Sequence, residues 1–436
     1  MIYSLQEENG FAVYRDLDEN RTISIPKDHC MGLFEAGDPP AVKGKSVYLE
    51  ALCQPEDGLP LRTLAEMKKA KTAAVIISDI TRQVPTAKVA PQLVEELVAG
   101  GVPLSGITFF VALGVHRPAT EEEMRLFLGE ELYGKVAIEN HEPYDEAALI
   151  DLGVTQRGTP VKVNKKAYLC DIKITIGKVE LHEMAGFSGG RKSILPGVSS
   201  EETILVNHRP EMIFSPGTGA GKLEGNPIHE DMLETAKLFG VHFSINFVVN
   251  NSGEVAGVFG GSLEGSHRAA VAFLRRFVDV KLPKAPDIAV ICPGQPLSCD
   301  LYQGVKALIA MQHVLRPDTV VVLYGAFPEG MNSVDFPKPL QLFEDLDEAK
   351  AYTIAHYRIQ MDHTLPIIDL LKREIRVIVC TEGVSATEIR QIRMSPVPKL
   401  DEALQQAYTL CGKAKPQVAF CPHPQKAVLT LAEPKE

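Results

Sequence analysis

The sequence contains no tryptophan, and aromatic residues make up only 6% of its 436 residues. Proteins that bind single-stranded nucleic acid stack the bases on aromatic side chains, so this composition disfavours such a surface. An excess of positive charge is also missing, because the formal net charge at pH 7 is -11. We therefore expect neither a nucleic acid nor a membrane surface as the main partner, although a small anionic substrate needs only a few local cations.

Paired cysteines, a leader and a long apolar run are missing as well. None of the 8 cysteines stands in a CxxC pair, and the N-terminus lacks a basic segment followed by an apolar one. The longest apolar stretch, 107–115, is well short of the roughly 20 residues that span a membrane. These features predict a soluble protein with reduced cysteines in a reducing compartment, most simply the cytoplasm.

Three common motifs are incomplete. His182-Glu183 begins an HExxH zinc motif, but residue 186 is glycine where the second histidine should stand. GTGAGK at 217–222 has three residues between its glycines, whereas a P-loop has four. No GxGxxG follows an early strand, so a dinucleotide-binding fingerprint is missing too.

A chain of this length predicts two domains. Short β-branched runs alternate with amphipathic stretches, which is typical of α/β domains with largely parallel sheets flanked by helices. Helices are expected over 86–99, from Thr120 onwards and over 267–278. The expected strands are 72–78, 107–113, 171–176, 288–292, 319–323 and 376–380.

KLPKAPD at 281–287 is the best candidate linker between the domains. We predict an N-terminal domain over 1–280 that binds the cofactor and carries the catalytic residues. A C-terminal α/β domain over 281–436 would close on the substrate, with the active site in the cleft between them. A final strand at 418–421 could return to either domain. The Gly- and Pro-rich stretch 186–227 is expected to form functional loops.

Two polar segments directly follow predicted strands, where open α/β sheets bind ligands. In SDITR (78–82), Asp79 and Arg82 can face one ligand, with the arginine clamping a carboxylate or phosphate. In GVHRP (114–118), His116 is well placed for acid–base chemistry. Each segment alone also fits a structural role, as a helix cap with a surface arginine or as a structural histidine.

The densest polar segment is HEMAGFSGGRKS, which starts at residue 182. The backbone amides of Ser188, Gly189 and Gly190 could form an anion nest for a phosphate, backed by Arg191. Lys192 could be a point charge on that phosphate or, with a depressed pKa, a covalent nucleophile.

Two further segments carry candidate ligands. Asn207-His208-Arg209 offers a potential metal ligand in His208. In YQGVK (302–306), Gln303 and Lys306 share a helix face near its N-terminal end, from which they could reach an anion.

Together these segments resemble the nickel-pincer-nucleotide lactate racemase family, over most of the chain and in the same order. The matching segments are SDITR at 78–82, GVHRP at 114–118, HEMAGFSGGRKSILPG at 182–197, NHRP at 207–210, LEGNPIHED at 223–231 and YQGVK at 302–306.

The resemblance implies a role for each matching position. Lys192 would form a covalent thioamide to a pyridinium mononucleotide, His208 would ligate its nickel, and His116 and His182 would be the general acid and base. The cofactor would also be contacted by Asp79, Ile80, Thr81, Arg82, Ser188, Gly189 and Gly190. The substrate would be bound by Arg82, Tyr302, Gln303 and Lys306.

The implied reaction is racemisation or epimerisation of lactate or a related 2-hydroxyacid by reversible hydride transfer to the cofactor. Separate cofactor-synthesis proteins would be needed for maturation, and the oligomeric state is not indicated. Two segments depart from the lactate pattern: Gln83 stands where proline is usual, and Leu181 and Glu183 flank His182 where proline and an aromatic residue are expected. These departures leave the choice of 2-hydroxyacid open.

Two alternatives remain. One is a phosphate- or nucleotide-handling enzyme that is centred on Lys192 and uses no nickel. The other is a protein that binds nickel or a hydroxyacid without turning it over, for which neither His116 nor His182 would be needed.

Overall fold

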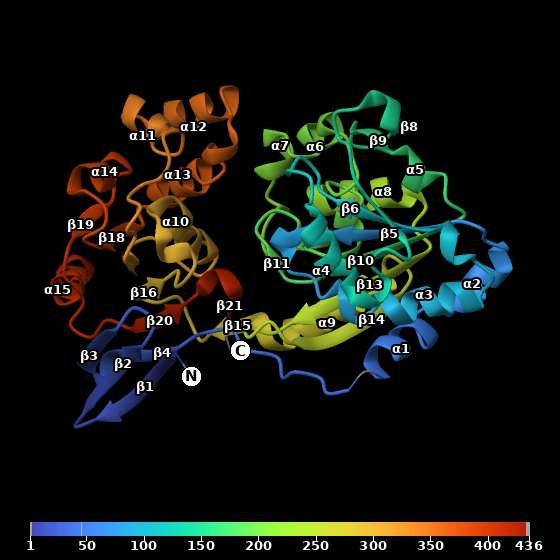
Figure 1. Ribbon diagram of the computed structural model, residues 1–436. Coiled ribbons are helices and arrows are strands. Elements are labelled where there is room, and N and C mark those ends of the chain that lie inside the picture. The colour runs from blue at the N-terminus through green and yellow to red at the C-terminus, as the bar shows by residue number, and fades with distance from the viewer. Residues whose placement is uncertain (1, 45, 433–436) are drawn as a thin grey trace. The chain divides into compact units, whose positions relative to one another are not determined.

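The computed structural model of the protein describes residues 2–44 and 46–432, which fold into two compact units (Figure 1). One unit comprises Asp38–Phe277. The other joins the N-terminal residues up to Gly37 to the chain from Val278 onwards.

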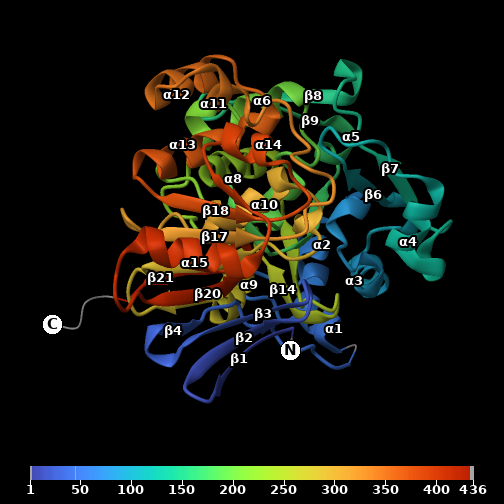
Figure 2. The same cartoon turned by 90° about the vertical axis from the view of Figure 1, so that its left-hand side faces the viewer.

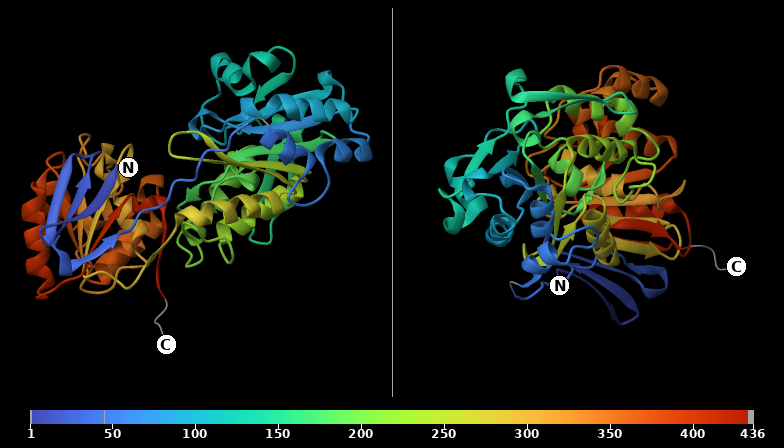
Figure 3. Two further views of the ribbon diagram at one scale, coloured as in Figure 1. Left: turned by 90° about the horizontal axis from the view of Figure 1, so that it is seen from below. Right: turned by 90° about the vertical axis from the view of Figure 1, so that its right-hand side faces the viewer.

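The N-terminal residues up to Gly37 therefore belong to the other unit, which differs from the prediction that 1–280 forms one domain. The division at Val278 lies close to the expected boundary. Strand β4 (Cys30–Leu33) pairs parallel with β20 (Val418–Pro422), which itself pairs with β16 (Ile288–Cys292). In the left view of Figure 3 the blue N-terminal strands accordingly lie beside the red C-terminal segments. A pairing between the two ends of a chain leaves no local pattern in the sequence.

The sheet of the Asp38–Phe277 unit has the order β14-β13-β10-β5-β6-β7, and only β14 runs antiparallel to its neighbour. Central strand β5 is buried on both faces, as its continuous apolar run predicts for a parallel strand. The carboxyl ends of the parallel strands meet at one edge of the sheet. The strands are β5 Ala73–Ser78, β6 Ile107–Ala112, β7 Ala137–Asn140, β10 Ile172–Lys178, β13 Phe243–Val249 and β14 Val255–Gly261.

Helices cover both faces of this sheet. Val75 and Ile77 of β5 pack in a core with α1, α2, α3 and α4, whereas Ala74 and Ile76 pack with α5 and α8. This division follows from the alternation of side chains along a strand. The helices are α1 Ser46–Cys53, α2 Leu61–Lys68, α3 Ala90–Ala99, α4 Glu121–Leu132, α5 Lys165–Tyr168 and α8 Pro227–Phe239.

The stretch predicted to form functional loops contains several short elements. After β10 the chain forms a two-stranded hairpin, a 3₁₀ turn and two short helices. These are β11 Leu181–His182, β12 Gly186–Phe187, the turn η6 Gly190–Ser193, α6 Glu201–Asn207 and α7 Pro210–Ile213. The unit also contains the hairpin of β8 Leu149–Val154 and β9 Pro160–Asn164, and it ends with α9 Gly265–Val278.

The second unit has a parallel sheet of order β19-β18-β17-β16-β20-β4 (Figure 2). An antiparallel sheet β1-β2-β3 packs on it through Tyr3, Tyr14 and Ile23, in one core with α15. The further strands are β1 Tyr3–Glu8, β2 Phe11–Asp16, β3 Arg21–Pro26, β15 Asp279–Leu282, β17 Val320–Tyr324, β18 Arg376–Cys380, β19 Ser395–Val397 and β21 Val428–Leu431. The helices are α10 Leu301–Ala310, α11 Lys338–Leu342, α12 Leu346–Ala355, α13 Thr364–Lys372, α14 Ala386–Gln391 and α15 Leu400–Cys411.

The expected strands are all present, with ends that differ by at most two residues. The helix expected over 86–99 begins only at Ala90, because Pro91 lacks the N–H that a helix interior needs and is tolerated only in the first turn. A 3₁₀ turn over Thr86–Lys88 precedes it. Within the described part of the chain, no helix has both the length and the apolar character needed to cross a lipid bilayer.

Candidate functional site

A cavity of about 180 Å³ lies at the carboxyl edge of the first sheet, where β5, β6 and β10 end. Of the predicted site residues in the Asp38–Phe277 unit, Ile80, Thr81 and Gly190 are not among those that line it. Eight predicted residues do line it: Asp79, Arg82, His116, His182, Ser188, Gly189, Lys192 and His208. All eight belong to the Asp38–Phe277 unit.

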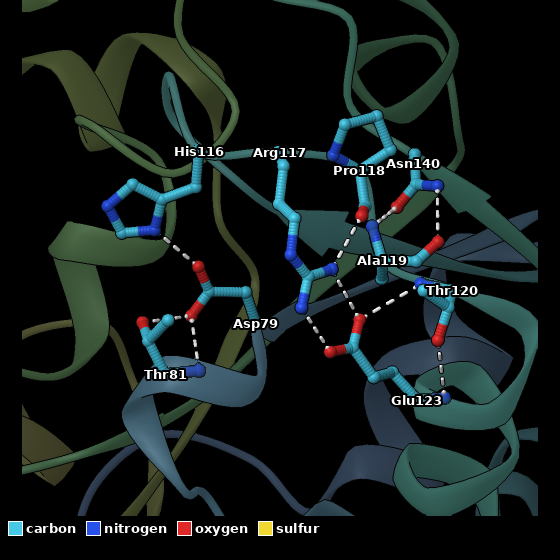
Figure 4. A network of polar contacts seen from close by, with 9 residues as sticks. All are labelled: Asp79, Thr81, His116, Arg117, Pro118, Ala119, Thr120, Glu123 and Asn140. Carbon is cyan, nitrogen blue, oxygen red and sulfur yellow. Dashed lines mark hydrogen bonds and ion pairs between the residues drawn. The ribbon is translucent and has the colours of Figure 1, made fainter.

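Asp79 follows β5 and is 6% exposed. Its Oδ1 accepts hydrogen bonds from the backbone N–H and the hydroxyl of Thr81, at 3.1 and 2.6 Å. Its Oδ2 lies 2.5 Å from Nδ1 of His116 (Figure 4). Because a carboxylate can only accept, the proton of a neutral His116 ring sits on Nδ1 and the lone pair is left on Nε2. His116 is therefore arranged as a base.

The loop that carries His116 is attached to helix α4. The guanidinium of Arg117 donates to both carboxylate oxygens of Glu123, at 2.9 and 2.6 Å. Glu123 also forms a capping box with Thr120 at the start of α4, the helix that was expected from Thr120 onwards. The bonds from Arg117 lower the pKa of Glu123 to about 2. Figure 4 shows Arg117 directed to α4 while the His116 ring turns the other way, toward Asp79.

His182 has the opposite arrangement. Its Nδ1 accepts hydrogen bonds from the backbone N–H groups of Met184 and Ala185, each at 3.2 Å. Since a backbone N–H can only donate, Nδ1 carries no proton and the neutral ring has its proton on Nε2. Burial, with a smaller contribution from the charge of Lys192, holds the pKa of His182 well below its usual value. His182 is therefore arranged as a hydrogen-bond donor.

Lys192 lies in the 3₁₀ turn η6, and its Nζ is 3.2 Å from Nε2 of His182. Burial is the largest influence on this amine, followed by the positive charges of Arg191 and Arg82. Together they lower the pKa of Lys192 from 10.5 to about 7. The neutral amine is thus far more accessible at neutral pH for Lys192 than for an ordinary lysine.

His208 caps the C-terminus of α6. Its Nδ1 is 3.0 Å from the carbonyl oxygen of Ile204, so Nδ1 donates and Nε2 keeps its lone pair. Burial, and then the charge of Lys192, lower the pKa of His208 to about 4. A neutral ring whose second nitrogen is tied to a carbonyl is the usual form of a metal-ligating histidine.

The amides of residues 188–190 do not form the predicted anion nest. The N–H of Ser188 donates to the carbonyl of Glu180, and the N–H of Gly190 donates to Oδ1 of Asn246, both at 2.9 Å. Gly189 has φ +85°, and a Cβ there would lie 2.7 Å from the same Asn246 oxygen. The amides of Ser188 and Gly190 are therefore bound to Glu180 and to Asn246 of β13, and neither points into an anion nest.

Arg191 is also placed differently from the prediction. It is 1% exposed and does not line the cavity. Its Nη2 donates to the carbonyls of Ala185 and Phe187, at 2.9 and 2.8 Å, and its Nη1 lies 2.7 Å from Nε2 of His267. The guanidinium thus fixes the path of the loop that leads to Lys192.

The sequence patterns did not single out Lys178 and Glu180, which also line the cavity. Their side chains form an ion pair of 2.8 Å at the end of β10. The same reasoning that found Asp79 and His116 could have found them, because they follow the predicted strand 171–176.

A buried carboxylate supports the residue before His208. Asp231 is fully buried on α8 and accepts hydrogen bonds from the hydroxyls of Thr155 and Thr159, at 2.5 and 2.8 Å. It also accepts a hydrogen bond of 2.7 Å from Nδ2 of Asn207, the last residue of α6. Asp231 therefore holds the end of α6 from which His208 projects.

Tyr302, Gln303 and Lys306 belong to the second unit. They lie in the first turns of α10, as predicted, and the N-cap Asp300 accepts a hydrogen bond of 2.7 Å from the N–H of Gln303. The hydroxyl of Tyr302 donates to Asp362 at 3.0 Å. Their part in substrate binding stays a prediction.

Comparisons with known proteins cover both units. The model of the lactate racemase N-terminal domain matches residues 18–221, and the model of the lactate racemase C-terminal domain matches residues 282–425. A lactate racemase of Lactiplantibacillus plantarum is 32% identical over 80% of this chain and 84% of its own length. One of Thermoanaerobacterium thermosaccharolyticum is 30% identical over 84% of this chain and 86% of its own.

The fold has a solved counterpart. The structure of the lactate racemase apoprotein from Thermoanaerobacterium thermosaccharolyticum superposes with a TM-score of 0.82 at 26% identity. The match covers 95% of this chain and 98% of that one.

Proposed function

The chain belongs to the lactate racemase family, and we propose that it interconverts the stereoisomers of a 2-hydroxyacid. The observation that carries the proposal is the opposite protonation of two histidines in one cavity. His116 presents a bare Nε2 backed by Asp79, whereas His182 presents an Nε2–H. A base and a hydrogen-bond donor are the two groups needed to convert a hydroxyl into a carbonyl and back.

The residues present fit the nickel-pincer nucleotide of this family. His208 has an Nε2 lone pair for nickel, because its Nδ1–H is bound to the carbonyl of Ile204. Lys192 offers an amine for a covalent bond to the nucleotide. When bound, this cofactor supplies a reversible hydride acceptor, which is needed because the Cα–H of a 2-hydroxyacid is too weakly acidic for a histidine alone.

The chain's own residues bind the substrate and move its hydroxyl proton. The guanidinium of Arg82 pairs with the substrate carboxylate, and such a charge-assisted contact contributes on the order of 1.5–3 kcal/mol. Nε2 of His116 removes the hydroxyl proton, and the carboxylate of Asp79 stabilises the imidazolium. His182 donates its N–H to the same oxygen. When the carbonyl is converted back into a hydroxyl, His116 would return the proton to that oxygen.

The second unit would contribute further contacts to the substrate. We propose Tyr302, Gln303 and Lys306 for this role, because they occupy one end of α10 and match the family's substrate-binding segment.

The departures from the lactate pattern bear on the substrate. Gln83 has φ +49°, a left-handed conformation that proline cannot adopt, so the turn after Arg82 differs from one that ends in proline. Glu183 adds a carboxylate next to His182. We propose lactate or a larger 2-hydroxyacid as the substrate, with malate, 2-hydroxyglutarate, aryl-lactates and sugar acids as compounds to test.

The alternatives receive less support. A phosphate-handling site built on residues 188–190 would need free amides, and those of Ser188 and Gly190 have partners within the fold. A protein that only binds nickel or a hydroxyacid would not need the pairing of His116 with Asp79, which prepares a base.

The cofactor is tested by intact-protein mass and nickel analysis after coexpression with cofactor-synthesis proteins. We expect a nucleotide-sized adduct that disappears in Lys192→Ala. Lys178→Ala is the matched control, because Lys178 lines the same cavity but forms an ion pair with Glu180, and we expect its adduct to persist. Material with the adduct is then assayed for racemisation of the 2-hydroxyacids. Well-folded protein without an adduct, when a known lactate racemase is loaded in parallel, would refute the cofactor assignment.

A further inference from the structure

The contact between His182 and Lys192 determines where the protons lie before any cofactor is attached. Two backbone N–H groups, those of Met184 and Ala185, donate to Nδ1 of His182. A proton on Nδ1 would face both of them, which excludes the imidazolium form and the tautomer protonated on Nδ1. The ring is therefore neutral and its proton is on Nε2.

The Nε2–H of His182 faces Nζ of Lys192 at 3.2 Å. An ammonium group has three N–H donors and no lone pair, so one of its hydrogens would point at the hydrogen of that N–H. A neutral amine has one lone pair and accepts the bond. The backbone contacts of one residue thus set the protonation state of the other.

On balance, burial and the surrounding charges also favour the neutral amine of Lys192. Burial disfavours the ammonium most, and the cations Arg191 and Arg82 disfavour it further, while the carboxylates of Glu183 and Glu180 favour it. Burial and these charges bring the pKa of Lys192 to about 7. His182 contacts Nζ, and the charges that act on it are those of Arg82, Glu180, Glu183 and Arg191; Lys192 in turn acts on His208.

We infer that the cofactor-free chain holds Lys192 as a neutral amine on the Nε2–H of His182, and so supplies the nucleophile for its own covalent loading. The inference deepens the proposed function and rests on it only for the identity of the natural electrophile. The class of electrophile is an activated carboxyl or thiocarboxyl carbon, because that is what an amine converts into an amide or a thioamide.

The step balances without a further reactant. The lone pair of Nζ forms a bond to the acyl carbon, the leaving group departs with the electrons of its own bond, and Nζ releases one proton to that leaving group. The product nitrogen is amide-like and has no basic lone pair. Acylation therefore removes the acceptor from His182, whose N–H becomes available to a substrate. His182 first keeps the amine neutral and afterwards serves turnover.

The test is competitive acetylation of the cofactor-free chain with N-hydroxysuccinimidyl acetate between pH 6 and 11, with peptide mass spectrometry to follow each lysine. A neutral amine is about 1,000-fold more abundant at pH 7 for a pKa of about 7 than for an ordinary lysine. Its lower basicity reduces the intrinsic rate, by about 30-fold if the slope for thiols applies. We expect Lys192 to react roughly 30-fold faster at pH 7 than Lys399, whose side chain is 72% exposed.

The pH profile identifies the cause. We expect the acetylation rate of Lys192 to level off near pH 7, and we expect His182→Gln to raise that midpoint by one unit or more, because the amide oxygen accepts a bond from an ammonium. His116→Gln is the matched control, since His116 lines the same cavity but binds Asp79, and should leave the midpoint unchanged.

Two outcomes would overturn the inference. A midpoint near pH 10 in the wild-type chain would show that Lys192 is an ammonium, and this measurement needs no variant to fold. A midpoint near 7 that stays in folded His182→Gln would assign the effect to burial alone. Because the probe carries neither nickel nor a nucleotide, neither result depends on whether the loaded chain racemises a 2-hydroxyacid.

Discussion

Asp79→Asn should move the ring proton of His116 from Nδ1 to Nε2 with almost no change in the shape of the side chain at position 79. Thr81 donates its N–H and its hydroxyl to Oδ1 of Asp79. In the variant the amide oxygen has to stay with these two donors, so the NH₂ group faces His116 at the place of Oδ2. That group can only donate, so Nδ1 of His116 must accept and its proton moves to Nε2. The cavity then contains two N–H donors and no base.

The expected loss follows from the two functions of the carboxylate. Without it, Nε2 has no lone pair for the hydroxyl proton, and the imidazolium loses its negative partner. General base catalysis contributes about 10²–10⁴-fold, and the same change in a serine-protease triad lowers kcat by about 10⁴-fold. We expect kcat to fall by about 10³–10⁴-fold in both directions, with KM nearly unchanged because Arg82 is untouched.

Two assays check this prediction. Racemisation is followed with the loaded enzyme, and the proton position is read from ¹⁵N chemical shifts of histidine in the cofactor-free chain. Wild-type His116 should show the proton on Nδ1, and Asp79→Asn should show it on Nε2. Thr81→Val is the control, because it leaves the carboxylate on His116 and should keep the wild-type tautomer. The reasoning fails if Asp79→Asn keeps the Nδ1 proton, or if kcat falls less than tenfold.

Three further predictions concern stability and are measured by urea or thermal unfolding of the cofactor-free chain. Asp231→Asn should lower the free energy of unfolding by about 2–4 kcal/mol, because an amide oxygen cannot accept from all three buried donors. The control is Glu211→Gln at a side chain that is 73% exposed, which should change the free energy of unfolding by less than about 0.5 kcal/mol. Burial lowers the pKa of His141 from 6.5 to about 4, so the unfolded chain binds its proton first and stability should be lost as pH falls from 6.5 to 4. That loss is on the order of 3 kcal/mol and should shrink in His141→Phe relative to wild type; an equal acid slope in both would contradict it. Gln83→Pro should destabilise the chain by about 2–4 kcal/mol, because proline cannot adopt φ +49° and removes the N–H that binds the carbonyl of Ile80. An unchanged midpoint of unfolding would show that the turn rearranges freely.

Local patterns predicted the parts of the fold that local physics determines. The buried strands β5, β6 and β16 are mostly apolar runs, and α4 begins at the position expected from Thr120. The position of Asp79 and His116 followed from the rule that ligands bind at the carboxyl ends of parallel strands. These residues line one cavity, as that rule requires.

The features that the sequence could not predict depend on contacts between residues that are far apart in the chain. The pairing of β4 with β20 joins the two ends of the chain and has no local signal. Ser188 and Gly190 read as an anion nest, yet their amides bind Glu180 and Asn246, whose approach only the folded sheet creates. The sequence also cannot predict which ring nitrogen of a histidine carries the proton, because this depends on whether its Nδ1 contacts a carboxylate or a backbone N–H.

That difference in protonation separates the roles of the two histidines. Loss of the Nε2 proton from His182 would leave an imidazolate, because its Nδ1 is occupied by the N–H groups of Met184 and Ala185. A proton added to Nδ1 would point at the hydrogens of the same two backbone N–H groups. His182 can therefore donate a hydrogen bond without exchanging its proton, as a neutral imidazole does when it polarises a carbonyl in an isomerase. His116 has no such restriction and carries the proton in both directions.

The consequence is measurable in the loaded enzyme. If only His116 exchanges a proton, kcat/KM should depend on pH through one histidine-type ionisation, and His182→Asn should retain activity because its amide N–H still donates to the substrate oxygen. We expect His182→Asn to be at least about tenfold more active than His182→Phe, since one hydrogen bond in a transition state is worth roughly 2 kcal/mol. His116→Asn, which can donate but cannot take up a proton, should be as inactive as His116→Phe. Two histidine ionisations in the wild-type profile, together with equal inactivity of His182→Asn and His182→Phe, would instead show that both rings transfer protons and that the backbone contacts of His182 open during turnover.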